Sequence, residues 1–135
     1  MKVPNIPEFI KVKITNRRNS LFKSDIKANR KKLFYEIKNK SVLVIGGAGT
    51  IGTSYIQALL KYSPNKLVVV DNNENGLTEL TRKLRSDSSI IMPNEYLTYP
   101  MSFSSRLFYK MIEKTGKFDI IANFAAHKHV RSEKD

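Results

Sequence analysis

A glycine-rich turn is the feature of the sequence with the clearest chemical meaning. Residues 45–52 read IGGAGTIG, which satisfies both the G-x-G-x-x-G and the G-x-x-G-x-x-G spacing. Glycines allow a sharp turn from strand into helix, and they let the backbone approach a pyrophosphate without a Cβ in the way. Free N–H groups and the positive end of the helix stabilise the phosphate charge. The sequence therefore predicts a phosphate-binding turn at Gly46, Gly49 and Gly52.

A carboxylate follows at the spacing expected for an adenosine ribose. Asp71 closes the next apolar run, 19 residues after Gly52, where it can accept hydrogen bonds from ribose hydroxyls. The alternative is a structural glycine turn with an unrelated surface aspartate. The carboxylate would repel the 2′-phosphate of NADP, and residues 72–74 include no Lys or Arg to neutralise that phosphate. The sequence thus favours NAD over NADP as the cofactor.

The stretch AAHKHV follows the last predicted strand. Ligands of doubly wound sheets bind beyond the carboxyl ends of the strands, where this stretch is expected to lie. Ala125 and Ala126 would let the backbone run beside the cofactor, and Lys128 would bring positive charge to its phosphate or sugar groups. His127 and His129 suggest zinc, but two ligands without a third make a poor site, so no metal is expected. A solvated loop is the other interpretation.

These motifs fall on a regular alternation of strands and helices. Apolar runs predict buried strands at 42–45 and 67–70, with further strands at 96–99 and 119–124. Helices are expected at 50–62, at 75–85, and from a cap at Ser104 to Gly116. This order implies βαβ units with right-handed crossovers. We therefore expect an α/β fold, the N-terminal part of a Rossmann-type doubly wound parallel sheet with about four strands in the order 3-2-1-4.

The first 40 residues differ in composition from the rest. They carry 12 Lys and Arg against three acids, whereas residues 41–135 carry 12 against nine. Residues 1–23 show no sustained period and are expected to form an extended or loosely packed arm. Ser24 or Asp25 is expected to cap a following helix. The predicted organisation is a basic arm plus helix over 1–40 and a partial NAD(P)-binding Rossmann domain over 41–135.

The composition also narrows location and partners. The absence of cysteine excludes disulfides and thiolate metal sites. The longest apolar runs have four residues, far short of the roughly 20 that a membrane-spanning helix needs. The net charge of +12 is not accompanied by an aromatic-interleaved basic platform or a nucleic-acid motif. We expect a cytoplasmic protein without a membrane or nucleic-acid partner.

Three segments resemble a known superfamily: VLVIGGAGTIG, LVVVDNNENGLTELTRKLRS and FDIIANFAAHKHVRSEKD. They are similar to the extended short-chain dehydrogenases/reductases, and within these to the polysaccharide-biosynthesis UDP-N-acetylglucosamine 4,6-dehydratases and related nucleotide-sugar epimerases. The resemblance implies a tightly bound NAD(P). In these enzymes the cofactor oxidises C4 of the sugar, water is lost across C5–C6, and hydride returns to C6.

The resemblance also implies roles for individual residues. It places the ribose on Asp71 and the rest of the cofactor along Ala125, Ala126 and Lys128. The pyrophosphate would be held by residues of the turn, namely Gly46, Gly49, Thr50, Ile51 and Gly52. One departure concerns the adenine: residues 99–102 read YPMS, without the acid that the family usually carries there.

The catalytic Tyr-x-x-x-Lys of the family has one match in this sequence, Tyr62 to Lys66. Pro64 lies inside that match and disrupts the helix that would align the pair, so we do not expect it to be catalytic. The sequence predicts the dinucleotide-binding portion of a nucleotide-sugar dehydratase or epimerase, inactive alone and acting as a homo-oligomer or with a partner chain. A stand-alone NAD(P)-binding or assembly subunit is the alternative.

Overall fold

The computed structural model describes residues 6–16 and 20–126, and its contacts divide the chain into two units, 1–33 and 34–135. In the first unit, helix α1 spans Ile6–Phe9 and a π-helix, η1, spans Ile10–Ile14. The N–H and the hydroxyl of Thr15 close this segment on the Ile10 carbonyl oxygen, at 2.9 and 3.2 Å. The backbone is thus helical and not extended, while the exposed side chains of η1 agree with the prediction of a loosely packed arm. A periodic pattern of apolar residues arises when one face of a helix is buried. Because η1 contains no buried residue, its sequence shows no such pattern.

Helix α2 spans Lys23–Ile37 and begins before its predicted cap. Ser24 and Asp25 lie inside its first turn, so neither is the capping residue. Just before the helix, the hydroxyl oxygen of Ser20 accepts from the Phe22 N–H at 3.3 Å. The prediction failed because several polar residues occur together here, and the backbone decides which of them lies outside the helix.

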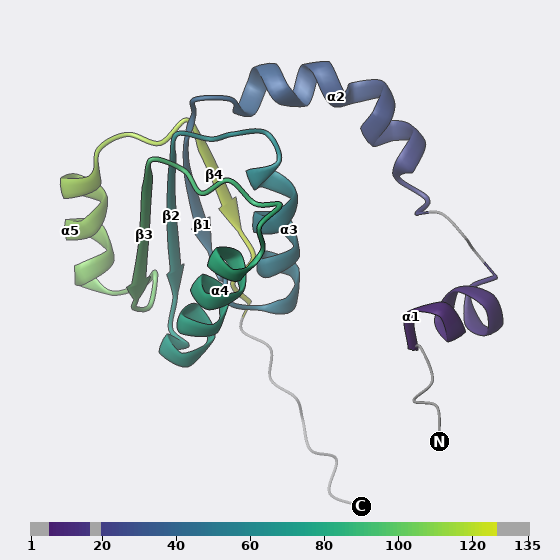
Figure 1. The fold of residues 1–135 in the computed structure, drawn as a ribbon. Coiled ribbons are helices and arrows are strands. Elements are labelled where there is room, and N and C mark those ends of the chain that lie inside the picture. Colours follow the sequence, from purple (N-terminus) through teal and green to yellow (C-terminus); the bar gives the residue numbers. More distant parts are fainter. Residues whose placement is uncertain (1–5, 17–19, 127–135) are drawn as a thin grey trace, which may run out of the picture. The chain divides into compact units, whose positions relative to one another are not determined.

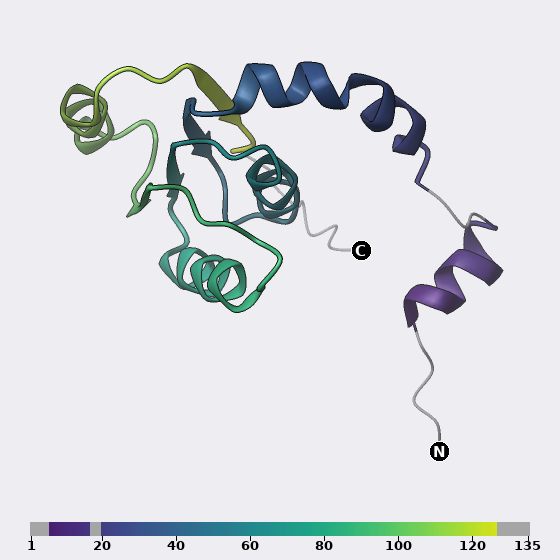
Figure 2. The ribbon, with the colours of Figure 1, turned by 45° about the horizontal axis from the view of Figure 1, so that its top comes forward.

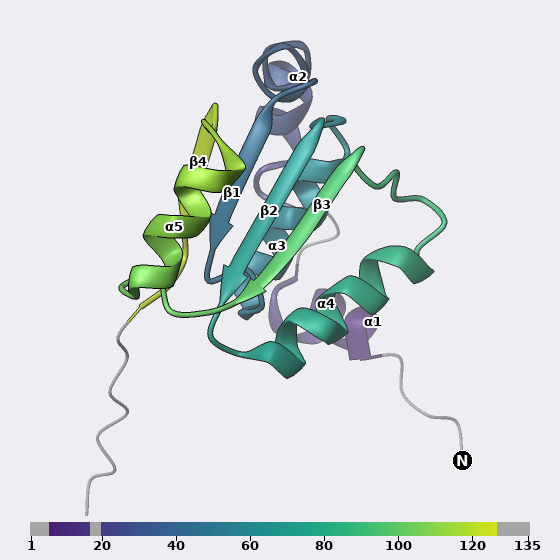
Figure 3. The same ribbon diagram turned by 90° about the vertical axis from the view of Figure 1, so that its left-hand side faces the viewer.

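The second unit contains a four-stranded parallel sheet in the order β3-β2-β1-β4, as predicted (Figure 3). The strands are β1 (Ser41–Ile45), β2 (Lys66–Asp71), β3 (Glu95–Pro100) and β4 (Ile120–Asn123). The connecting helices are α3 (Thr50–Leu60), α4 (Glu74–Ser86) and α5 (Arg106–Thr115). Helices α3 and α4 cover one face of the sheet and α5 covers the other (Figures 1 and 2). The predicted fold class is confirmed.

Two helix ends differ from the sequence prediction. Helix α3 ends at Leu60 instead of Tyr62, because the Tyr62 N–H bonds the carbonyl three residues back and tightens the last turn. Helix α5 is capped by Ser105 instead of Ser104, since the Ser105 hydroxyl oxygen accepts from the Phe108 N–H at 3.2 Å. Consecutive serines are equivalent as caps in sequence, and only the backbone distinguishes them.

The side chains of β1 and β2 alternate between two core layers. The layer beneath α3 and α4 contains Val42, Val44, Leu67 and Val69, together with Ile56, Leu59, Leu60, Leu77, Leu80 and Leu84. The layer beneath α5 contains Leu43, Ile45, Val68, Val70 and Met111. Because helices cover both faces, the two central strands are apolar along most of their length. This burial fixes the strand ends, where the glycine turn and Asp71 lie.

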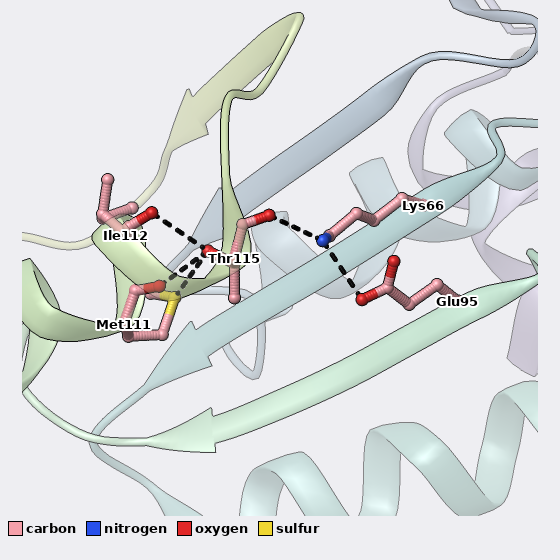
Figure 4. A network of polar contacts seen from close by, with 5 residues as sticks. All are labelled: Lys66, Glu95, Met111, Ile112 and Thr115. Carbon is pink, nitrogen blue, oxygen red and sulfur yellow. Dashed lines mark hydrogen bonds and ion pairs between the residues drawn. The ribbon is translucent and has the colours of Figure 1, made fainter.

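Lys66 joins three elements at the amino ends of the strands (Figure 4). Its ammonium group donates to the Thr115 carbonyl oxygen at 2.8 Å and pairs with the Glu95 carboxylate at 3.1 Å. Its side chain is only 14% exposed. The last carbonyls of a helix lack intrahelical partners, and a cation there also complements the helix dipole. Lys66 therefore anchors the end of α5 to the sheet.

Replacing this lysine tests its structural contribution. We expect Lys66→Met to lower the free energy of unfolding by about 1–3 kcal/mol, because it removes a charge-assisted hydrogen bond and an ion pair. Urea denaturation would measure the change. Lys110→Met, on the exposed side of α5, is the matched control and should alter stability by less than about 0.5 kcal/mol. Equal losses in both variants would contradict the assigned role.

Candidate functional site

The turn after β1 is held against its neighbours by Gly46. This residue has a φ of +75°, and its N–H donates to the Val70 carbonyl oxygen at 2.7 Å. A Cβ at this position would lie 2.5 Å from the backbone nitrogen of Ala125. Glycine is required both by the left-handed conformation and by this close approach. The turn thereby meets the segment that follows β4.

Two other glycines permit close packing beneath the turn. A Cβ on Gly47 would overlap the side chain of Val69, and one on Gly52 would overlap the carbonyl oxygen of Gly46. Both glycines are buried. They let α3 start directly against the turn and the sheet. Gly52, predicted to hold the pyrophosphate, thus lies beneath the turn and not on its open side.

The open side of the turn is the N-terminus of α3. Gly49 occupies the N-cap position and provides no side-chain cap. A Cβ on Gly49 would meet only the Gly46 carbonyl oxygen, at 3.5 Å. The predicted residues Thr50 and Ile51 begin the helix, and both are exposed. The first N–H groups of a helix lack intrahelical partners and carry its positive dipole, so this end can receive an anionic group.

Asp71 connects the end of β2 to the glycine turn. Its Oδ2 accepts from the Ala48 N–H at 2.9 Å, and its Oδ1 accepts from the Asn73 N–H at 3.0 Å. Each carboxylate oxygen has a second lone pair, so both can still accept a hydrogen bond from a ligand hydroxyl group. The ribose contact of Asp71 is a prediction from the sequence, whereas its bond to Ala48 was not predicted. Nothing in the sequence indicates that bond, because almost every residue type carries a backbone N–H.

The turn and Asp71 line a pocket of about 240 Å³ at the carboxyl ends of the strands. Its lining includes five predicted residues, Gly46, Gly49, Asp71, Ala125 and Ala126. It also includes residues that the sequence analysis did not assign: Ile45, Val70, Asn72, Met101, Ser102, Phe103 and Phe124. Their residue types carry no ligand signature. They share the pocket because parallel pairing brings the ends of all four strands to one edge.

Asp71 is the only charged side chain in the described lining of this pocket. Positive potential at the described part of the site therefore comes from backbone N–H groups and the α3 dipole. The predicted Lys128, with His127 and His129, lies outside the described residues. Within residues 6–16 and 20–126, no cluster of three His, Cys, Asp or Glu side chains is arranged to hold a metal ion.

An aromatic pair supports the segment after β4. The rings of Tyr55 on α3 and Phe124 lie 5.0 Å apart, centroid to centroid. Burial raises the pKa of the Tyr55 hydroxyl above its ordinary value, which further favours the neutral form. Tyr62 and Lys66, the chance Tyr-x-x-x-Lys match, lie in a turn and on β2. The prediction that they do not share a helix is confirmed.

The sequence matches the family described as "Polysaccharide biosynthesis protein" over residues 42–134. The chain belongs to this family. The family match begins in β1 and includes the glycine turn, Asp71 and the segment after β4. The resemblance to the polysaccharide-biosynthesis group of extended short-chain dehydrogenases/reductases is thereby confirmed.

Several curated proteins are similar to parts of the chain. It is 44% identical over 50 residues to an uncharacterized membrane protein of Methanocaldococcus jannaschii, covering 37% of this chain and 15% of that protein. It is 28% identical over 97 residues to the capsular polysaccharide biosynthesis protein CapD of Staphylococcus aureus, covering 70% and 16%. It is 32% identical over 91 residues to dTDP-D-glucose 4,6-dehydratase of Homo sapiens, covering 67% and 25%. The matches thus span between 15% and 25% of these relatives' lengths.

A solved structure supports the same fold. Pen from Bacillus thuringiensis superposes with a TM-score of 0.57 at 26% identity, over 70% of this chain and 27% of that chain. Despite the name of the M. jannaschii relative, none of the described helices of this chain is long and apolar enough to cross a membrane.

Substitutions at Gly52 and Gly49 are expected to affect stability to different extents. We expect Gly52→Ala to lower the free energy of unfolding by about 1–3 kcal/mol, since its Cβ overlaps backbone that cannot easily move. Gly49→Ala should lower it by less than about 1 kcal/mol, because the space beside Gly49 is open. Thermal or urea denaturation of the two variants would measure the difference. A larger loss for Gly49→Ala would show that the packing assigned to these positions is wrong.

Proposed function

We propose that this chain supplies the NAD-binding part of a nucleotide-sugar 4,6-dehydratase or epimerase of polysaccharide biosynthesis. The observation that carries the proposal is one pocket in which the uncapped N-terminus of α3 lies beside the Asp71 carboxylate. The first suits a pyrophosphate and the second suits a ribose diol. The family match and the similarity to a dTDP-D-glucose 4,6-dehydratase support the substrate class.

Different residues of the pocket would bind different parts of the dinucleotide. Backbone N–H groups at Gly49, Thr50 and Ile51 would hold the pyrophosphate, and Asp71 would accept hydrogen bonds from the adenosine ribose. The small side chains of Ala125 and Ala126 leave room for the other half of the cofactor, where Lys128 would add positive charge. NAD, when bound, supplies a reversible acceptor for hydride from the sugar.

The electrostatics of the pocket favour NAD over NADP. A 2′-phosphate on the adenosine ribose would lie against the Asp71 carboxylate and would be repelled by it. The residues that follow Asp71 in the pocket and at the start of α4, Asn72, Asn73 and Glu74, offer no cation. Asp71 also cannot turn away freely, because both of its oxygens are held by backbone N–H groups.

Residues 1–135 by themselves are proposed to bind cofactor without completing the reaction. The one Tyr-x-x-x-Lys match does not form a helical pair, and the pocket holds no alternative acid or base besides Asp71 among its described residues. We therefore propose that the proton transfers of a dehydratase use residues outside the described lining of this pocket.

Calorimetry with this chain tests the proposal. We expect saturable binding of NAD and weaker binding of NADP. Asp71→Asn should weaken NAD binding on the order of tenfold, because its amide loses a ribose acceptor and turns a donor toward a backbone N–H. The same variant should narrow the difference between NAD and NADP. Glu79→Gln, an exposed change on α4, is the control and should bind NAD as the unmodified chain does. Unchanged affinity in Asp71→Asn would refute the assigned ribose contact.

Gly49→Ala gives a second test at the other end of the pocket. The added methyl group would stand where the pyrophosphate must approach the backbone, so NAD affinity should fall at least about tenfold with little loss of stability. The same calorimetric titration, paired with a thermal melt, would measure both quantities. Retained affinity would mean that phosphate does not bind at the α3 N-terminus.

A further inference from the structure

Strand order locates the base-binding end of the pocket. The glycine turn follows β1 and Asp71 follows β2, so a dinucleotide that spans them continues toward β3. Met101 follows β3, and its N–H donates to the Asp71 carbonyl oxygen at 2.9 Å. Beyond Asp71, the lining consists of Asn72 and residues 101–103. If the proposed function holds, these residues surround the purine base.

This end of the pocket combines apolar surface with neutral polar groups. Met101 and Phe103 are half-buried and pack against the core layer beneath α5, so they offer an apolar surface to the face of a base. Asn72 and Ser102 are exposed and uncharged. The one carboxylate in the described lining, that of Asp71, already accepts from two backbone N–H groups, and its remaining acceptor capacity is assigned to the ribose. The edge of the base therefore meets the neutral side chains.

The Ser102 hydroxyl can present either a donor or an acceptor. It lies 2.8 Å from the Ser104 hydroxyl, and either group can be the donor in that bond. The Ser104 N–H also donates to the Ser102 oxygen, at 3.3 Å. If Ser102 donates to Ser104, one of its lone pairs remains free to accept from a ligand. If Ser104 donates instead, the Ser102 proton remains free for a ligand. Reversal of one hydrogen bond switches the group that the base meets.

We propose that the base subsite of this chain accepts a 6-oxopurine as readily as adenine, and that Ser102 is the position that sets this tolerance. Adenine carries an amino donor at C6, whereas hypoxanthine carries a carbonyl acceptor there. An ionised carboxylate only accepts, so one that faced the C6 substituent would favour the amino group of adenine over the carbonyl of hypoxanthine. Ser102 satisfies either base by reversing its bond to Ser104, and the amide of Asn72 likewise offers both a donor and an acceptor.

Calorimetric titration of the chain with NAD and with nicotinamide hypoxanthine dinucleotide tests this tolerance. The two dissociation constants should agree within about threefold. Ser102→Asp places an acceptor-only group at the same exposed position and should favour NAD on the order of tenfold. Ser102→Asn, of similar size but able to donate and accept, is the matched control and should keep the ratio near one.

The outcomes separate this inference from the function on which it rests. A preference of the unmodified chain for NAD above about tenfold would overturn the base tolerance and leave the NAD proposal intact. Failure of both dinucleotides to bind would overturn both proposals. A ratio that Ser102→Asp leaves unchanged, with its thermal melt preserved, would show that Ser102 does not set the base preference.

Discussion

Parallel pairing of β1 with a strand on each side is the constraint on which the site depends. The register sets Ile45 opposite Val70 on β2 and opposite Asn123 on β4, so β1 and β4 end at the same level and β2 continues one residue further. A turn that leaves β1 there must pass between two other chain segments. The Gly46 N–H bonds the Val70 carbonyl oxygen, and a Cβ on Gly46 would overlap the backbone of residues 124 and 125. At Gly46, this crowding and the positive φ both require glycine.

Crowding on one side of the turn leaves its other side open. The buried Gly47 and Gly52 bring the start of α3 against the sheet, and Gly49, the N-cap of that helix, lines the pocket. Asp71 then holds the turn by accepting from the Ala48 N–H. The same carboxylate is therefore both a structural contact and a candidate ribose ligand. A substitution of Asp71 is therefore expected to disturb the glycine turn at the phosphate end of the pocket as well as the contact at the ribose end.

The two ends of the sheet hold different kinds of polar contact. At the amino ends, Lys66 satisfies the last carbonyl of α5 and an acid on β3, which leaves its charge paired within the fold. At the carboxyl ends, the α3 N-terminus has no side-chain cap and Asp71 keeps spare acceptor capacity. The proposed cofactor site uses this spare hydrogen-bonding capacity at the carboxyl ends of the strands.

The sequence alone determined the strand order, the buried runs of β1 and β2, and the positions of Gly46, Gly49 and Asp71. Apolar periodicity and glycine spacing are local consequences of burial and of backbone conformation, so both can be read along the chain. Tertiary structure decided the rest. The Asp71 bond to Ala48 and the Ser102 pair join backbone or hydroxyl groups that most polar sequences contain. Met101 and Phe103 line the pocket because sheet order places the end of β3 beside that of β2.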